Sequence, residues 1–160
     1  MNIFYLDPDP VKCAQYQVDR HVVKMAVEST QILCSAYFKT GEDYLSHYKK
    51  THLNHPCCKW AAESLSNWLW LRELGLALCD EYTYRYGKTH KCKSVIESLV
   101  VPSLPDIGFT ELPLVMDEIY ITDGGAVDSY RNYYRCGKRG LWSWKRRGIP
   151  EWLREPTIYN

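Results

Sequence analysis

The chain has 160 residues, and its 20 Lys and Arg nearly balance its 19 Asp and Glu, so the formal net charge of +1 excludes a protein that coats nucleic acid by charge alone. No apolar run approaches the roughly 20 residues of a membrane-spanning helix, and no membrane partner is expected. Seven cysteines, an odd number without a C-x-x-C pair or a signal segment, favour free thiols in a reducing cytoplasm. The length predicts one domain, residues 1–160.

The first half of the sequence predicts an extended start and two long helical stretches. Residues 3–6 are apolar and expected to be extended. Asp9-Pro10 is typical of a helix start, because Asp accepts a hydrogen bond from a free amide and Pro lacks the amide hydrogen. The predicted stretches are residues 10–38 with a break near Asp19, a polar connection over 41–53, and residues 56–86 with a restart near Ser66 and Gly87 as C-terminal cap.

The second half predicts less regular structure. A short helix is expected over residues 94–100, and the three prolines of "VPSLPDIGFTELP" indicate an extended crossing of the surface. Asp123 is expected to cap a final helix that ends at Gly137. The fold class is therefore predicted as mainly α, a single compact helical domain with an extended N-terminal segment and an irregular C-terminal tail.

At about 100° per residue, the first helical stretch separates into an apolar face and a polar stripe. The stripe consists of Gln17, His21, Lys24, Glu28 and Gln31. One interpretation is a solvated flank that carries an ordinary surface ion pair. Against it, Val23 and Val27 lie beyond the stripe, where water would be expected, so the stripe also fits the wall of a cleft. In a cleft, Glu28 would be suited to proton transfer or to stabilising a cation.

Further polar candidates lie outside the stripe. "LNHP" places Asn54 and His55 at the start of a helix, whose positive end attracts phosphate. Asn67, Glu81 and Arg85 share helical spacing on the second long stretch. The alternative for Glu81 and Arg85 is a surface ion pair at i, i+4.

The C-terminal region is locally basic and aromatic, with seven Lys and Arg and no Asp or Glu between residues 131 and 147. The candidates there for stacking on bases and contacting phosphates are Arg139, Trp142, Trp144, Lys145 and Arg146. The alternative is a packing lid, in which the Trp side chains cover the core and the basic groups are solvated.

No metal ion and no cofactor are expected. His52 and His55 could ligate a metal together, but no carboxylate or Cys set completes a familiar zinc spacing. Neither a Gly-rich phosphate loop nor a Ser nucleophile motif is present.

Three stretches carry a family resemblance: "MNIFYLDP" at the start, "HVVKMAVESTQIL" in the first helical stretch, and "LNHP" with the helix that ends in "EYTYRYG". Together, over about residues 1–90, they resemble the pyrimidine dimer DNA glycosylase family, the endonuclease V-like proteins. The chain also resembles a set of bacteriophage proteins with the pattern "DKHVVKM…E" and "NHP…W", which would place it in the cytoplasm of a host cell.

The resemblance implies an all-helical enzyme whose N-terminal α-amine attacks the sugar C1′, displaces the base and forms a Schiff base. The bulky Asn2 favours retention of Met1, so the amine would belong to Met1. Glu28 matches the catalytic Glu of the family, which stabilises the cationic sugar and assists later elimination. Val27 stands where the family has an Arg. The implied catalytic residues are Glu28, His21 and Met1.

The residues expected to bind substrate are Arg20, Lys24, Gln31, Asn54, His55, Asn67, Glu81 and Arg85. Three functions stay open at this point. The first is cleavage of an N-glycosidic bond in DNA or in a nucleotide. The second is action on a small nucleotide, such as a modified deoxynucleotide or a host immune signal. The third is binding of such a nucleotide, or of a host protein, without catalysis.

Overall fold

The computed structural model describes residues 1–154, and every regular element in that part of the chain is helical. The expected fold class is therefore confirmed. The α-helices are α1 (Pro10–Tyr16), α2 (Asp19–Thr40), α3 (Pro56–Ala61), α4 (Leu65–Tyr86), α5 (Cys92–Ser98) and α6 (Ala126–Gly137). Short 3-10 turns are η1 (Asp43–Leu45), η2 (Glu118–Tyr120), η3 (Arg139–Leu141) and η4 (Glu151–Arg154).

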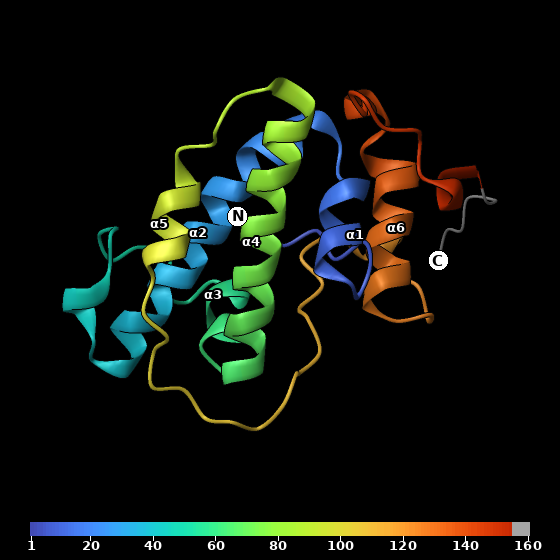
Figure 1. Cartoon of the computed structure of the whole chain (residues 1–160). Helices are drawn as coiled ribbons and strands as arrows, with labels where there is room; N and C mark the ends of the chain where they lie inside the picture. Colours follow the sequence, from blue (N-terminus) through green and yellow to red (C-terminus); the bar gives the residue numbers. More distant parts are fainter. Residues whose placement is uncertain (155–160) are drawn as a thin grey trace.

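The two long helices α2 and α4 pack against each other at the centre of the molecule (Figure 1). Helices α3 and α5 pack against both of them, and α1 packs against α4. Gly75 of α4 lies close to both neighbouring helices, since an added Cβ would lie 3.0 Å from the Ile96 side chain of α5 and 3.8 Å from Ser29 of α2. Trp68 in α4 donates its indole N–H to the carbonyl of Leu33 in α2, at 3.0 Å, which fixes the pairing.

The predicted helix breaks are present, and each has a local cause. Gln17 and Val18 are extended, which separates α1 from α2. Ser64 caps α4 through its hydroxyl, which accepts from the Ser66 amide, so α4 begins at Leu65. Gly41 and Gly87 end the two long helices with φ of 76° and 66°, the left-handed conformation that glycine adopts without strain.

Two sequence-based expectations about helix starts were wrong. Asp123 does not cap α6: the N-cap is Gly125, with a φ of 96°, and no side chain bonds to the free amides there. The short helix α5 begins at Cys92 rather than near Ser94, because the His90 ring Nδ1 accepts a hydrogen bond from the Cys92 amide at 3.0 Å. The N-cap residue itself, Lys91, makes no side-chain cap hydrogen bond, so the sequence has no ordinary helix-start signal there.

The segment between α5 and α6 is extended and crosses the surface to reach α6 (Figure 1). It is held by the Leu65 amide, which donates to the Pro105 carbonyl at 2.9 Å, and by the Ser64 hydroxyl, which donates to the Gly108 carbonyl. Near its end, the Val115 carbonyl accepts from the Asn2 side chain at 2.9 Å. The segment thereby fixes the chain start as well as α6.

The N-terminal segment is extended, as expected, and lies between α2 and α6. Ile3, Phe4 and Leu6 are buried in the same apolar core as the helices. The Phe4 ring stacks on His21 of α2 at a centroid distance of 4.1 Å and contacts Tyr130 of α6 edge-on. Burial of three large apolar side chains supplies about 1.5–3 kcal/mol each, so the path of this segment is strongly fixed.

A buried ionic cluster joins the end of α4 and the start of α2 to the C-terminal tail. Arg85, 2% exposed, donates to Glu81 Oε1 at 3.1 Å and to Asp19 Oδ1 at 3.0 Å. It also donates to the carbonyls of Gln17 and Gln15 at 2.8 and 2.9 Å. Arg147 of the tail completes the cluster by donating to Glu81.

We predict that Arg85→Leu lowers the free energy of unfolding by about 3–5 kcal/mol, because it leaves Glu81 buried with less compensating charge and removes the hydrogen bonds to two carbonyls at the end of α1, those of Gln15 and Gln17. Urea titration followed by circular dichroism measures this. Lys93→Ala is the matched control, since it breaks the exposed ion pair with Asp80 and should cost no more than about 1 kcal/mol. Equal effects of the two substitutions would contradict a stabilising role for the cluster.

Candidate active site

The α-amine of Met1 forms an ion pair with Glu28 of α2, with 3.2 Å between the nitrogen and Oε1. The Met1 and Glu28 side chains are only 9% and 12% exposed, so solvent screens this pair less than a surface pair. The second carboxylate oxygen of Glu28 is buried and has no hydrogen-bond partner among residues 1–154. One oxygen thus holds the amine while the other stays available to a further group.

The position of Met1 is set by three neighbours. The Cys58 thiol donates to the Met1 sulfur at 3.7 Å. The next residue, Asn2, donates to Val115 O and accepts from the Tyr130 hydroxyl at 2.8 Å, so the chain cannot slide along its path. His55 lines the same cavity from the start of α3. These contacts to the side chains of Met1 and Asn2 define where the amine points.

His55 has two roles in the structure. Its Nδ1 accepts from the Cys57 amide at 3.1 Å and caps α3, as the cap-then-proline pattern predicted for this region. Burial lowers the pKa of His55, and the charges of the Met1 amine and His52 lower it further, while Glu28 and a hydrogen bond to the Met1 backbone act in the opposite direction. The ring therefore touches the N-terminal residue as well as the helix.

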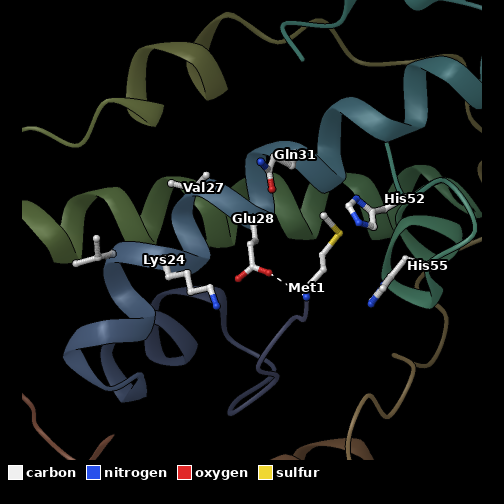
Figure 2. A pocket seen from close by; sticks show the side chains of 8 residues that line it. Met1, Lys24, Val27, Glu28, Gln31, His52 and His55 are labelled. Atoms are coloured by element: carbon white, nitrogen blue, oxygen red, sulfur yellow. Dashed lines mark ion pairs between the residues drawn. The ribbon is translucent and has the colours of Figure 1, made fainter. Parts of the chain in front are cut away.

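A cavity of about 610 Å³ lies in front of the amine and the carboxylate (Figure 2). Figure 2 shows Lys24 and Glu28 projecting from α2 on one side and His52 and His55 on the other, with Met1 between them. The lining residues are Met1, Val23, Lys24, Val27, Glu28, Gln31, His52 and His55. The part of the polar stripe from Lys24 to Gln31, with Val23 and Val27 beside it, therefore forms a cleft wall, one of the two interpretations that the sequence allowed. Cavities of this volume suit small organic groups.

A smaller cavity of about 260 Å³ lies next to the first and shares Met1, Lys24 and Glu28 with it. The residues that line only this cavity are Asn2, Phe4, His21, Met25, Val115, Tyr133 and Lys138. His21 bonds to the Tyr134 hydroxyl through Nδ1 at 2.7 Å. Burial, followed by the charges of Lys138, Lys24 and Arg20, lowers the pKa of His21 to about 3, so the ring is neutral near pH 7.

Of the other residues predicted on the polar stripe or near it, some line the cavities and some do not. Gln31 and Lys24 reach the cavity. Gln17 is fully buried between α1 and α2 and lines neither cavity. Arg20 and Asn54 are exposed and also lie outside both linings.

The structure does not bring Asn67, Glu81 or Arg85 to either cavity. The Asn67 amide is fully buried, donating to Trp60 O and Thr110 Oγ1 and accepting from the Thr110 amide at 2.9 Å. Glu81 and Arg85 belong to the buried ionic cluster described above rather than to a surface pair. Their hydrogen-bonding groups are occupied by the protein, which is the signature of structural polar residues.

The tail residues divide into two kinds. Trp142 and Trp144 donate their indole N–H groups to Tyr134 O and Tyr16 O, at 3.0 and 2.8 Å, and pack on the core as a lid would. The basic side chains Arg139, Lys145 and Arg146 are exposed, and their cations lie over the rings of Trp142, Tyr86 and Tyr84. The basic groups are accessible to phosphate, whereas the two indoles are already engaged.

The lining residues that sequence reasoning did not predict as site residues include His52, Tyr133 and Lys138. His52 has a φ of 53°, uncommon for a non-glycine residue, and bonds through Nδ1 to the Thr51 hydroxyl at 2.6 Å. Lys138 follows the end of α6, and only the local basic composition pointed to it. No periodicity links these residues to the stripe, so they could not be found by pattern.

Within residues 1–154, no three His, Cys, Asp or Glu side chains gather in a way that could hold a metal ion. No helix in the same part of the chain is both long and apolar enough to cross a membrane. The candidate site is therefore described by its organic groups: an amine, a carboxylate, imidazoles, an amide and lysines.

A helical fold that carries an N-terminal amine beside a nearly buried glutamate, at the mouth of a cavity, is the arrangement expected for a DNA glycosylase that uses its N-terminus. The family model of pyrimidine dimer DNA glycosylase matches residues 1–94, more than half of the chain. The chain belongs to this family, which supports a glycosylase-like function on DNA. Comparison with curated proteins and with solved structures gave no match.

The low pKa of His21 predicts acid sensitivity of the fold. Between about pH 6.5 and pH 3, the unfolded chain takes up a proton on this group that the folded chain does not, so stability falls as pH falls, by up to about 1.4 kcal/mol per pH unit. Urea unfolding of wild type and His21→Gln at pH 7.5, 6.5, 5.5 and 4.5 measures this. The variant should lose less stability over this range; parallel curves would show that His21 does not contribute.

Proposed function

We propose that the chain cleaves N-glycosidic bonds in DNA, with the α-amine of Met1 as nucleophile and Glu28 as the carboxylate that stabilises positive charge and moves protons. The observation that carries the proposal is the 3.2 Å distance between the Met1 nitrogen and Glu28 Oε1 at the mouth of a cavity. Membership of the pyrimidine dimer DNA glycosylase family supports a DNA substrate.

The first step breaks the bond between the sugar and the base. The amine gives up a proton, and its lone pair forms a bond to C1′ while the bond from C1′ to the base nitrogen breaks. The electron pair of the broken bond leaves with the base, which takes up a proton. The amine nitrogen then loses a second proton, and opening of the C1′–O4′ bond, with protonation of O4′, gives a Schiff base between Met1 and C1′.

Glu28 is suited to this step because positive charge develops on the sugar. Its free Oε2 is buried, and an anion in a weakly screened site stabilises a nearby cation far more than it would in water. The Oε1 that pairs with the amine can also accept the proton that the amine must lose. His21 contributes a neutral ring, so it does not add to the positive charge of the lysines around it.

The second step is elimination. A base removes a proton from C2′, and the bond from C3′ to the phosphate oxygen breaks, so the phosphate leaves with the electron pair. Glu28 lies beside the nitrogen from which the Schiff base forms and is the candidate base. Val27, the residue before Glu28 on α2, lines the cavity and carries no charge. The negative charge of the leaving phosphate must therefore be stabilised by cations elsewhere in the site.

We predict that borohydride traps a covalent adduct on Met1 when the chain is incubated with duplex DNA that carries a cis-syn thymine dimer. Intact and peptide mass spectrometry locates the adduct. Glu28→Gln should lower the rate of glycosidic bond cleavage, measured as strand breaks after alkali treatment, at least about 100-fold, because it removes the charge that faces the sugar cation. Glu73→Gln, an exposed change on α4, is the control and should behave as wild type.

A chain extended by two residues before Met1 provides the complementary test, since its amine can no longer occupy the position beside Glu28. Full glycosidic bond cleavage by the extended chain, or an adduct on a lysine, would contradict Met1 as nucleophile. Full activity of Glu28→Gln would contradict the role of the carboxylate.

Salt dependence separates DNA from a small nucleotide as substrate. Exposed or half-exposed cations at Arg20, Lys24 and Lys138 surround the site. Each phosphate contact that they make in duplex DNA adds about 0.9 to the slope of log affinity against log salt. We predict a slope of about −2 to −3 for kcat/KM on the dimer duplex. A flat profile, together with turnover of a free nucleotide, would favour the small-nucleotide alternative.

A further inference from the structure

The chain start is held by a closed set of hydrogen bonds around Tyr130 of α6, which is fully buried. The Tyr130 hydroxyl lies 2.8 Å from Asn2 Oδ1 and 2.9 Å from the Pro113 carbonyl oxygen. It also accepts from the Val115 amide at 3.2 Å. Asn2 closes the set, because its Nδ2 donates to the Val115 carbonyl at 2.9 Å. The chain start, the extended segment and α6 therefore meet at one hydroxyl group.

These hydrogen bonds allow the Asn2 side chain one orientation. Its Oδ1 accepts from the Ile3 amide at 2.8 Å and from the Tyr130 hydroxyl, while its Nδ2 faces a carbonyl. A rotated amide would place its NH₂ against the Ile3 amide and its oxygen against the Val115 carbonyl, so these bonds would be lost. Burial raises the pKa of Tyr130, so the hydroxyl keeps its proton and remains a donor at neutral pH.

The orientation of Asn2 limits where the Met1 amine can lie. Ile3 is buried in the core, so Asn2 is held through its side chain and through the residue that follows it. Because the Met1–Asn2 peptide is planar, the amine can then move only by rotation about two bonds, N–Cα of Asn2 and Cα–C of Met1. Without the side-chain contacts, rotation about Cα–C of Asn2 is added, and this rotation moves the whole of Met1 away from Glu28.

Tyr130 does not belong to the lining of either cavity beside the Met1–Glu28 pair. Its connection to the amine runs through the Asn2 side chain. Tyr130 and Val115 also lie outside residues 1–94, the part of the chain that the family model matches. The matched part thus contains the amine and the carboxylate, whereas the groups that hold Asn2 come from the rest of the chain.

We propose that Tyr130 is a positioning residue: through the Asn2 side chain, its hydroxyl holds the Met1 amine where the nitrogen lone pair can reach C1′ of the sugar. This inference rests on the proposed function for the reaction that the amine performs. A displacement of a reacting group by about 1 Å can cost about 100-fold in rate. The rate should therefore depend on a hydroxyl that touches neither the substrate nor the carboxylate.

The first test compares Tyr130→Phe with Tyr37→Phe. Each change removes one hydroxyl from a fully buried tyrosine, and the Tyr37 hydroxyl donates to the Val100 carbonyl and lines neither cavity. Glycosidic bond cleavage is followed in single turnovers on a thymine-dimer duplex, as strand breaks after alkali treatment. Tyr130→Phe should lower the rate constant at saturating protein about 10- to 100-fold and leave the dissociation constant unchanged. Tyr37→Phe should match wild type in both.

Asn2→Leu tests whether Tyr130 acts through Asn2. Leucine keeps a bulky second residue, so Met1 should be retained, which intact mass spectrometry checks, but it forms none of the side-chain hydrogen bonds. The double variant with Tyr130→Phe should react no more slowly than Asn2→Leu alone, because both changes remove the same contact. Asn2→Leu is also the second variant should Tyr130→Phe fail to fold, and it should show the same loss of rate.

A measurement without DNA reports on the amine itself. Limited acetylation with acetic anhydride, followed by peptide mass spectrometry, gives the rate at which the Met1 amine is modified. An amine held against Glu28 in a partly buried position is poorly accessible to the reagent. The rate should rise several-fold in Tyr130→Phe and in Asn2→Leu, and stay at the wild-type value in Tyr37→Phe.

Wild-type cleavage rates in Tyr130→Phe, or an equal loss in Tyr37→Phe, would overturn the positioning role. Multiplied losses in the double variant would show that Tyr130 does not act through Asn2 and would overturn it as well. An absence of cleavage and of a Met1 adduct in the wild-type chain would instead contradict the proposed function. In that case the acetylation rates still decide whether Tyr130 positions the amine.

Discussion

The candidate site depends on burial of the N-terminal segment. Ile3, Phe4 and Leu6 lie in the apolar core, and together they hold the first residues between α2 and α6. Release of this segment would expose three large apolar side chains, so the chain start has little freedom. A terminal amine is normally mobile and solvated. Here the core itself delivers the amine to Glu28, at the cost of ordering the chain end.

Two histidines position the walls of the site through the same kind of hydrogen bond. His55 and His90 each accept a backbone amide through Nδ1 at the start of a short helix, at 3.1 and 3.0 Å. The proton must then be on Nε2 of each ring. His90 donates this proton to the carbonyl of Val23, at 3.1 Å, and the hydrogen bond joins the start of α5 to the first turns of α2. His55 contacts the backbone of Met1. Each ring thereby connects a helix start to an element of the cavity.

The polar residues of the two long helices have opposite roles. Those of α2 that face the cavity have groups without a partner among residues 1–154: the Glu28 Oε2, the Gln31 amide and the Lys24 ammonium. Those of α4 already form hydrogen bonds within the protein. Asn67 bonds to Trp60 and Thr110, and Arg85 donates to four groups of the buried cluster. Helical spacing is the same in both cases. What distinguishes a binding residue from a structural one is whether its partners are already in the chain.

The sequence by itself determined the helical class, the positions of the helix breaks and the face of α2 that is polar. These features depend on local chemistry: proline and serine at helix starts, glycine at helix ends, and apolar residues at helical spacing. The same pattern identified Glu28, Lys24 and Gln31. The resemblance of the first residues to the family added Met1 to the predicted site residues, because the family uses its N-terminal amine as nucleophile and helical periodicity gives no information about a chain terminus.

Only the tertiary structure decided which polar residues share a cavity. His52 comes from the connection between α2 and α3, which returns to the side of α2. Lys138 is distant in sequence from α2 and meets the stripe because the extended segment and α6 fold back onto the N-terminus. Asn67 and Arg85 were assigned to substrate by spacing, yet the fold places their partners on Thr110, Gln15 and Gln17. The physical reason is that a helical pattern fixes the side of the helix on which a residue lies, whereas the partner on that side depends on long-range packing.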